Sequence, residues 1–276
     1  MTKLLFSIII PTLNEEKFLP HLLESLAAQS YRDFEVIVCD GSSKDRTVEK
    51  AKSFADRLPH LKVVTSKKAN LPLQRNVGAR YAKGKWLVFL DADNVLYPYC
   101  LQRCRDYLQS SKTRFFTTWF SPDSDVSGDA NLILVSNMFI EAAKIVKRQL
   151  APGPFAAVTR EAFDSVDGYN EQCRYGEDVD FSMRLYEQDV PLTILRETLY
   201  VYSLRRFRKH GTLKMLQLYT KGSMIALLTG RSPKTMPGYV MGGHNYEKRK
   251  KVNKSKLRKY ELKLKKIIKG ILETKI

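Results

Sequence analysis

The sequence predicts an α/β fold: a Rossmann-like, mostly parallel sheet flanked by helices and followed by an α-helical C-terminal extension. Three observations indicate this class. Short apolar runs alternate with longer amphipathic stretches in the first part of the chain, and turn residues separate them. The 276 residues are 43% hydrophobic and 28% charged, which is typical of a globular protein with a large core. A repeated strand-helix order produces parallel strands with helices on both faces of the sheet.

Four strand-helix pairs are predicted first. Each strand is a short, mostly apolar run, and each following helix repeats its apolar residues every three or four positions. In chain order the pairs are Leu4–Ile10 and Glu15–Ala28, Phe34–Cys39 and Asp45–Ala55, Lys62–Thr65 and Leu73–Ala82, and Trp86–Leu90 and Pro98–Gln109. After residue 112 we expect an α+β half, with a strand-like stretch at 114–120, a polar loop at 121–130 and a helix near Leu132–Lys147.

The positive charge of the chain is concentrated near its C-terminal end. Lys and Arg number 47 against 29 Asp and Glu, which gives a net charge of +18. Residues 247–276 hold 13 Lys and Arg and three Asp and Glu, and so contribute +10. The apolar residues that keep helical spacing among these lysines are Leu257, Tyr260, Leu264, Ile267, Ile268 and Ile271. This pattern predicts a basic amphipathic helix.

Three roles are open for this basic tail. Residues 248–276 could lie on an anionic membrane surface, with Leu213–Leu228 as a second interfacial helix. A solvated tail is the second alternative. Nucleic acid is the least expected partner, because the sequence shows no aromatic stacking platform and no known nucleic-acid-binding module.

The sequence predicts a cytoplasmic protein that could bind peripherally to the cytoplasmic face of the membrane. No run reaches the roughly 18 uncharged apolar residues that a spanning helix needs. The first apolar run leads into a turn at residues 11–14 without a small-residue cleavage site. The cysteines are Cys39, Cys100, Cys104 and Cys173. They form no CxxC pair, which favours reduced thiols over disulfides or a zinc site.

Polar residues follow three of the predicted strands. They are Thr12, Asn14 and Glu15, next to Pro11, after the first strand, Asp40, Ser42 and Ser43 after the second, and Asp91 and Asp93 after the fourth. Because ligands bind beyond the carboxyl ends of parallel strands, we expect these residues to form one site. Capping of the following helices by Asn14 and Ser43 is an equally weighted alternative.

Asp91 and Asp93 form an Asp-Ala-Asp sequence directly after a buried strand. Two nearby carboxylates repel each other unless a cation lies between them. Mg²⁺ or Mn²⁺, bound by these oxygens and by a diphosphate, would remove the repulsion and stabilise a departing phosphate. A solvated turn is the alternative for an isolated Asp-x-Asp.

Four segments resemble the successive signatures of the family 2 inverting glycosyltransferases. They are residues 7–29, 34–51, 74–94 and 168–185, and they occur in the family's order. The resemblance implies the A-type glycosyltransferase fold, a UDP- or GDP-sugar donor and inversion at the anomeric carbon. The resemblance does not name the acceptor; a lipid-linked acceptor, to which a membrane-bound basic tail would bring the site, and a precursor of a cell-surface glycan are the two expectations.

The resemblance also assigns roles in donor binding. The residues expected to hold the base and ribose are Pro11, Thr12, Asn14, Glu15 and Asp40. Arg75 and Asn76 match positions that lie near the donor. Asp91 and Asp93 match the metal-binding pair, in which the second Asp is the surer ligand.

The second half supplies the remaining expected roles. Asp178, with Glu177 beside it, matches the family's Glu-Asp pair at the start of a helix and is expected to take the proton from the acceptor. Arg205 or Arg206 could clamp the leaving diphosphate, because guanidinium groups bind phosphate oxygens in pairs; a solvated basic strand end is the alternative. For a third metal ligand three alternatives are open: His210, His244, or no histidine.

These assignments predict a catalytic domain at residues 1–210 and a basic helical extension at 211–276. Within the domain, residues 1–112 would bind the nucleotide sugar and 113–210 the acceptor. A nucleotidyltransferase is one alternative, but it normally has a Gly-rich, basic phosphate loop after strand one, where this chain has Pro-Thr-Leu-Asn-Glu. A basic scaffold or nucleic-acid-binding protein with an inactive transferase domain is the other.

Overall fold

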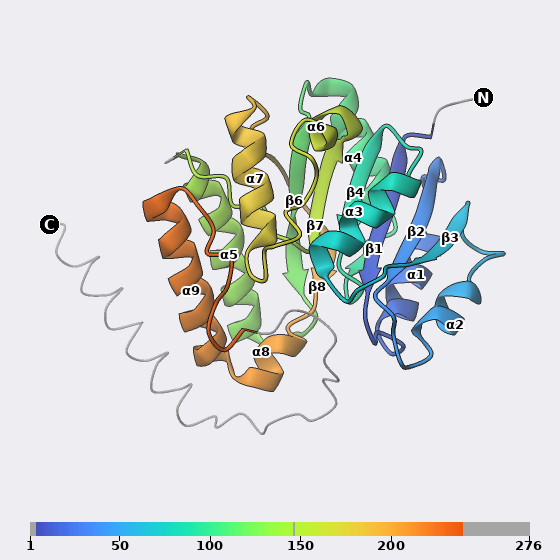
Figure 1. Ribbon diagram of the computed structural model, residues 1–276, viewed down its shortest axis with the longest axis horizontal. Helices are drawn as coiled ribbons and strands as arrows, with labels where there is room; N and C mark the ends of the chain where they lie inside the picture. The colour runs from blue at the N-terminus through green and yellow to red at the C-terminus, as the bar shows by residue number, and fades with distance from the viewer. Residues whose placement is uncertain (1–3, 146, 240–276) are drawn as a thin grey trace, which may run out of the picture.

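The computed structural model describes residues 4–145 and 147–239. They form an eight-stranded sheet in the order β3-β2-β1-β4-β7-β6-β8-β5 (Figure 1). The strands are β1 (Phe6–Thr12), β2 (Phe34–Asp40), β3 (Leu61–Thr65), β4 (Trp86–Leu90), β5 (Val95–Leu96), β6 (Phe115–Pro122), β7 (Phe155–Thr159) and β8 (Thr193–Tyr202). The helices are α1 (Leu19–Ala27), α2 (Thr47–Lys52), α3 (Leu71–Tyr81), α4 (Cys100–Ser110), α5 (Ser127–Ile145), α6 (Arg160–Asp164), α7 (Glu177–Glu187), α8 (Arg205–His210) and α9 (Thr212–Thr229).

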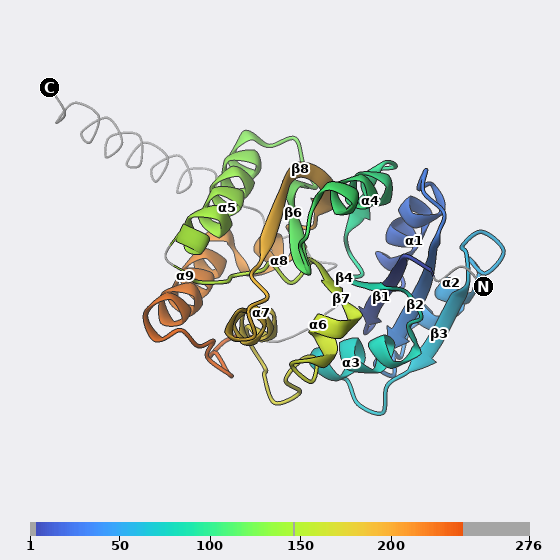
Figure 2. The same ribbon diagram turned by 90° about the horizontal axis from the view of Figure 1, so that it is seen from above.

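The first half of the fold agrees with the sequence prediction. Strands β1 to β4 are parallel, and β1 and β2 are buried along their whole length. Helices α1 and α4 lie on one face of the sheet, while α3, α6 and α7 lie on the other (Figure 2). Burial on both faces explains why these strands read as continuous apolar runs. Helix α3 approaches β1 so closely that a Cβ on Gly78 would lie 2.5 Å from Ile9 Cγ2.

The second half adds antiparallel pairs to the mostly parallel sheet that the sequence predicted. Strand β7 runs antiparallel to both β4 and β6, and β5 runs antiparallel to β8. Only β6 and β8 form a parallel pair there. The chain returns from β6 through α5 and inserts β7 between β4 and β6, so the sheet is mixed. The prediction missed β5, β7 and β8 because no strand-helix alternation marks them.

The long helices α5 and α9 lie together at the end of the molecule farthest from β3 (Figures 1 and 2). Their C-terminal parts meet where Ala143 packs near Ala226 and Leu150. In the part of the chain that the structure describes, no helix is both long enough and apolar enough to cross a membrane. The predicted tail helix and His244 lie outside the described residues.

Candidate functional site

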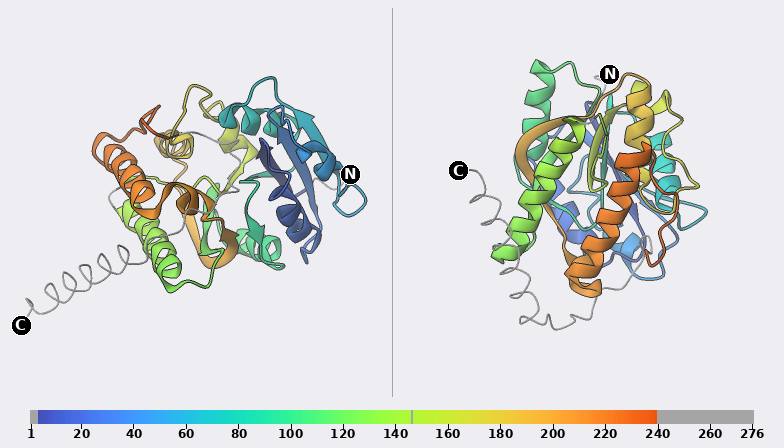
Figure 3. Two further views of the ribbon diagram at one scale, coloured as in Figure 1. Left: turned by 90° about the horizontal axis from the view of Figure 1, so that it is seen from below. Right: turned by 90° about the vertical axis from the view of Figure 1, so that its left-hand side faces the viewer.

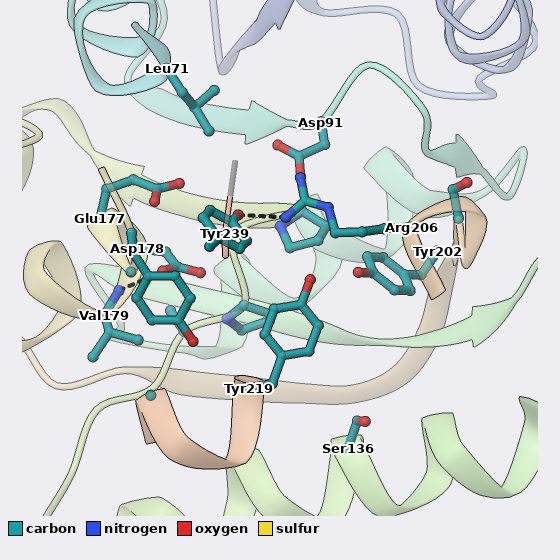
Figure 4. A pocket seen from close by; sticks show the side chains of 18 of the residues that line it. Leu71, Asp91, Ser136, Glu177, Asp178, Val179, Tyr202, Arg206, Tyr219 and Tyr239 are labelled. Carbon is teal, nitrogen blue, oxygen red and sulfur yellow. Dashed lines mark hydrogen bonds between the residues drawn. The ribbon is translucent and has the colours of Figure 1, made fainter. Parts of the chain in front are cut away.

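The candidate site is a cavity of about 560 Å³ at one edge of the sheet. The carboxyl ends of β1, β4, β6 and β8 and the amino end of β7 meet at this edge, because β7 alone among them runs in the opposite direction. Side chains from both halves of the chain point into the cavity (Figure 4). The predicted site residues that line it are Pro11, Thr12, Glu15, Arg75, Asp91, Asp93, Glu177, Asp178, Arg205 and Arg206.

Arg205 joins the ends of β1 and β4. Its Nη1 and Nη2 each donate to a carboxylate oxygen of Glu15 at 2.7 Å, and its Nε lies 2.7 Å from Asp93 Oδ2. The guanidinium also lies over the ring of Phe18, 4.3 Å from the centroid. Burial raises the pKa of Glu15 to about 7, against the opposing effect of Arg205, and burial also raises the pKa of Asp93.

Arg75 connects two sets of carboxylates across the cavity: those that follow β4 and those that begin α7. This side chain on α3 is only 1% exposed, and its Nη1 donates to Glu177 Oε1 at 3.1 Å. Its Nη2 donates to Asp91 Oδ1 at 3.1 Å and to the carbonyl oxygen of Gly153 at 3.2 Å. The guanidinium carbon lies 4.9 Å from the centroid of the Tyr169 ring. One buried cation therefore fixes the position of Asp91 relative to Glu177.

Glu177 and Asp178 are the first two residues of α7, as the sequence predicted. Gly176 precedes them in the left-handed conformation (φ 62°), which turns the chain into the helix. Burial raises the pKa of Glu177 to about 7, with a further contribution from Asp178, and burial raises the pKa of Asp178 as well. A Cβ on Gly153 would lie 3.0 Å from Asp178 Oδ2, so glycine leaves room for this carboxylate.

Asp40 and Asn14 lie behind the cavity wall rather than on it. Asp40 Oδ1 accepts hydrogen bonds from the hydroxyls of Thr12 (3.1 Å) and Ser43 (2.5 Å). The Asn14 N–H donates to Ser43 Oγ at 2.8 Å, and Asn14 Oδ1 accepts from the N–H of Lys44. These contacts join the loops after β1 and β2. Asn14 and Ser43 cap neither following helix, so the capping alternative is wrong.

Asn76 points away from the cavity. Its Nδ2 donates to the carbonyl oxygen of Tyr169 at 2.8 Å, and its Oδ1 accepts from the N–H of the same residue at 2.8 Å. The Nδ2 also donates to Glu171 Oε1 at 3.1 Å. Asn76 therefore holds the loop before α7 in place. We expected it near the donor, but it is not among the residues that line the cavity.

The histidines give no support for a third metal ligand. His210 is the last residue of α8 and does not line the cavity. Within residues 4–145 and 147–239, no three His, Cys, Asp or Glu side chains are grouped as metal ligands. Asp91 and Asp93 remain the pair of carboxylates that could hold a divalent ion.

Several residues that the sequence reasoning missed also form the cavity. Gln74 Nε2 donates to the carbonyl oxygens of Thr12 and Cys39 at 2.7 and 2.8 Å, and so links the ends of β1 and β2. Tyr219 and Tyr239 also line the cavity (Figure 4), and Tyr239 accepts a 2.5 Å hydrogen bond from Arg206 Nη1. Gln74 directly precedes Arg75 in a segment that resembles the family, so the sequence contained a signal for its role. No local sequence pattern indicates that the two tyrosines line the cavity.

The outer part of the cavity is apolar and lies between α5 and α9. We call this part the α5–α9 groove; its side chains are Leu132, Val135, Phe139, Leu216, Thr220 and Met224. Val135, Phe139, Leu216 and Met224 are also exposed, so the groove reaches the surface. The same cavity is lined by Glu177 and Asp178 farther in. An elongated apolar group could therefore lie in the groove with a polar end near the carboxylates.

The fold and the arrangement of the site are those of the A-type glycosyltransferase fold, with strand-end carboxylates facing an acidic helix start. The sequence profile of glycosyl transferase family 2 matches residues 7–166. The chain belongs to this family.

Curated relatives and solved structures are similar to this chain. An uncharacterized glycosyltransferase of Haemophilus influenzae is 30% identical over 67% of this chain and 63% of its own length. A PGL/p-HBAD biosynthesis glycosyltransferase of Mycobacterium tuberculosis is 30% identical over 68% of this chain and 72% of its own. The chain thus spans less than two thirds of the first of these relatives.

Two solved structures share the fold. Staphylococcus aureus TarS with UDP-GlcNAc superposes with a TM-score of 0.61 at 23% identity, over 72% of this chain and 58% of that one. A mannosyltransferase of Pyrobaculum calidifontis, with GDP-Man and Mn²⁺, also gives 0.61 at 20% identity, over 83% and 65%. At this level of identity the likeness establishes the A-type fold.

Proposed function

We propose that this protein is a metal-dependent, inverting glycosyltransferase that moves a sugar from a UDP- or GDP-sugar to an acceptor. One observation carries the proposal: a single cavity joins Asp91 and Asp93 at the end of β4 to Glu177 and Asp178 at the start of α7. Arg75 fixes the spacing of the two sets. Family membership supports the same activity.

Asp178 is the proposed catalytic base. The acceptor hydroxyl must lose a proton as it attacks the anomeric carbon, and inversion needs the base on the face opposite the leaving diphosphate. Glu177 is held by Arg75 at 3.1 Å, whereas the side chain of Asp178 is hydrogen-bonded to the N–H of Val179. Asp178 thus keeps oxygen lone pairs for a proton, and its raised pKa makes it a stronger base than an exposed Asp.

Asp91 and Asp93 are the proposed ligands of Mg²⁺ or Mn²⁺. Their donor set fits such an ion, because both offer carboxylate oxygens, which hard divalent cations prefer. The positive guanidinium of Arg205 lies against Asp93, which is consistent with a position that favours a cation. When bound, the ion would act as a Lewis acid toward the leaving diphosphate. The Mn²⁺ in the mannosyltransferase structure supports the choice of metal.

The donor is proposed to lie along the ends of β1, β2 and β4. Pro11, Thr12 and Glu15 line this part of the cavity, while Asp40 and Asn14 shape it from behind. Arg205 and Arg206 point into the same space and would hold the diphosphate oxygens. In this arrangement residues 1–112 bind the nucleotide sugar and 113–210 the acceptor, followed by the extension at 211–276.

The proposed acceptor is lipid-linked, and the apolar lining of the α5–α9 groove supports this choice. A lipid chain in the groove would place its polar end toward Asp178. The proposed location is the cytoplasmic face of a membrane, with the protein bound peripherally. The four cysteines are free and buried, which agrees with a reducing compartment.

Donor hydrolysis tests the proposal. Binding and slow hydrolysis of UDP-, GDP- and dTDP-sugars would be measured with Mn²⁺, Mg²⁺ or EDTA. We expect one donor to be hydrolysed only with metal, and Asp93→Asn to lower the rate by at least about 10²-fold, because the leaving charge loses its stabilisation. Asp56→Asn, which changes an exposed carboxylate away from the site, is the matched control.

Two outcomes would contradict the proposal. Full activity of Asp93→Asn, or of the wild type in EDTA, would remove the metal role. Folded protein that binds none of the donors, but binds DNA or RNA in a salt-sensitive manner, would favour the scaffold alternative.

A further inference from the structure

The outward face of α5 is apolar. From residue 134 to residue 145 of this helix, every exposed side chain is apolar, and Met138 and Ile145 are 61% and 82% exposed. The opposite side of the helix, with Ile133 and Ile140, is buried against the body of the protein. A surface helix normally turns charged residues outward, so this exposure calls for a partner.

Helix α9 continues the apolar surface. The two helices lie side by side at one end of the molecule, and Figure 3 shows them together in both views. Leu213 and Leu228 on α9 are 43% and 75% exposed. We define the α5–α9 face by its residues Leu134, Met138, Ala142, Ile145, Leu213 and Leu228. The groove residues lie between the two helices, so the face borders the mouth of the cavity.

The charges beside this face are mainly positive. Lys214 and Lys221 are exposed on α9, and the sequence of α9 contains no Asp or Glu. The acidic residues of α5 are already engaged: Glu141 pairs with Arg196, and Asp129 accepts from a neighbouring serine. An apolar surface bordered by lysines matches the interface of an anionic bilayer, with acyl chains below and phosphates above.

We propose that the α5–α9 face inserts into the surface of an anionic lipid bilayer and that the groove opens toward the lipid. A second copy of the chain fits less well, because a two-fold contact would bring Lys214 and Lys221 against like charges. The basic segment 247–276 fits less well for the same reason, since it carries a net charge of +10 from 13 Lys and Arg and three Asp and Glu. The inference concerns membrane contact and does not depend on the proposed chemistry.

The buried cysteines make a direct test feasible. Cys39, Cys100, Cys104 and Cys173 are all buried, so a cysteine introduced on the surface is the thiol that a probe reaches first. Met138→Cys in the full chain would carry a nitrobenzoxadiazole fluorophore. Its emission would be recorded with and without vesicles of equimolar phosphatidylglycerol and phosphatidylcholine. Tyr99→Cys, on a residue exposed to 47% directly before α4, is the matched control.

We expect vesicles to shift the emission at position 138 to the blue and to leave position 99 unchanged. Leu134→Gln combined with Met138→Gln should weaken vesicle binding by about tenfold or more, because two apolar side chains no longer enter the lipid. Tyr99→Gln should bind like the wild type. Neither Leu134 nor Met138 lines the cavity, so donor hydrolysis should continue in the double variant.

Three results would overturn the inference. Vesicle binding with an unchanged spectrum at position 138 would assign the binding to the basic tail alone. A blue-shifted spectrum before lipid is added would mean that the tail or a second copy covers the face; sedimentation would distinguish these two. No binding to anionic vesicles would remove the bilayer as the partner.

Discussion

Arg75 shows why single residues of this site depend on distant ones. Its buried guanidinium is held by Asp91, 16 positions away, and by Glu177, 102 positions away. Removing the guanidinium would leave the buried carboxylate of Glu177 without its counter-ion, which typically costs about 3–5 kcal/mol. The residue that spaces the two sets of carboxylates thus also stabilises the fold around them.

The acid pair predicts how activity depends on pH. The proposed base must be ionised, and burial raises the pKa of both Asp178 and Glu177, the latter to about 7. We therefore expect kcat/KM to rise with pH and to fall off on the acidic side at a higher pH than for an exposed aspartate, because burial raises the pKa of Asp178. Initial rates between pH 5 and 9, at saturating metal, would check this.

Substitutions distinguish the role of Asp178 from that of Glu177. Asp178→Asn should lower kcat by at least about 10²-fold at every pH, because the group that takes the proton is lost. Glu177→Gln should keep measurable turnover and move the acidic limb to lower pH, because the neighbouring negative charge disappears. The reverse pattern would assign the base to Glu177.

At the level of single residues, the sequence predicted the positions that strand ends and helix starts determine. Asp91, Asp93 and Asp178 lie at the cavity as expected, because each is close to the end of a strand or the start of a helix. Tyr239 could not be predicted, because its position depends on how residues beyond α9 fold back over the cavity. The contact of Asn76 with Tyr169 could not be predicted either, since its local segment does not reveal this partner.

At the level of elements, the contact of α3 with β1 positions Arg75. Gly78→Ala would put a Cβ 2.5 Å from Ile9 Cγ2 on a buried strand, so the helix must move. We expect the free energy of unfolding to fall by about 1–3 kcal/mol. Urea denaturation would measure the change.

Gly128→Ala is the control for this prediction. Gly128 lies in the first turn of α5, and a Cβ there meets nothing within 4 Å. Helix propensity should then make the substitution neutral or stabilising, by up to about 1 kcal/mol. Equal destabilisation by both substitutions would show that the packing at Gly78 is not the cause.

The elements themselves were predictable where local sequence specifies them. Strands β1 to β4 are buried, apolar and followed by amphipathic helices, so periodicity found them. Strand β5 has two residues and β7 has five, and each is stabilised by pairing with distant strands. Their pairing and direction depend on long-range contacts that periodicity does not report.

At the scale of the whole molecule, the structure depends on two kinds of contact: those between segments close in the sequence and those between segments far apart. The parallel pairs β1–β2 and β2–β3 join strands that lie close together in the sequence. The site instead needs Arg205 to reach Glu15, 190 positions earlier. Local sequence patterns indicate contacts of the first kind but not of the second. The sequence therefore indicated the class of the fold more fully than the geometry of the cavity.

The 190-residue separation between Arg205 and Glu15 has a consequence for the order of folding. Closing short loops costs less entropy than closing long ones, so β1 to β4 can associate before α8 arrives. In pulsed hydrogen exchange during refolding, we expect amides of β1 and β2 to gain protection before those of α7; simultaneous protection would contradict this. A chain still emerging from the ribosome would then have β1 to β4 in place before Arg205 exists, so the contact that joins Glu15 to α8 forms only once synthesis has passed residue 205.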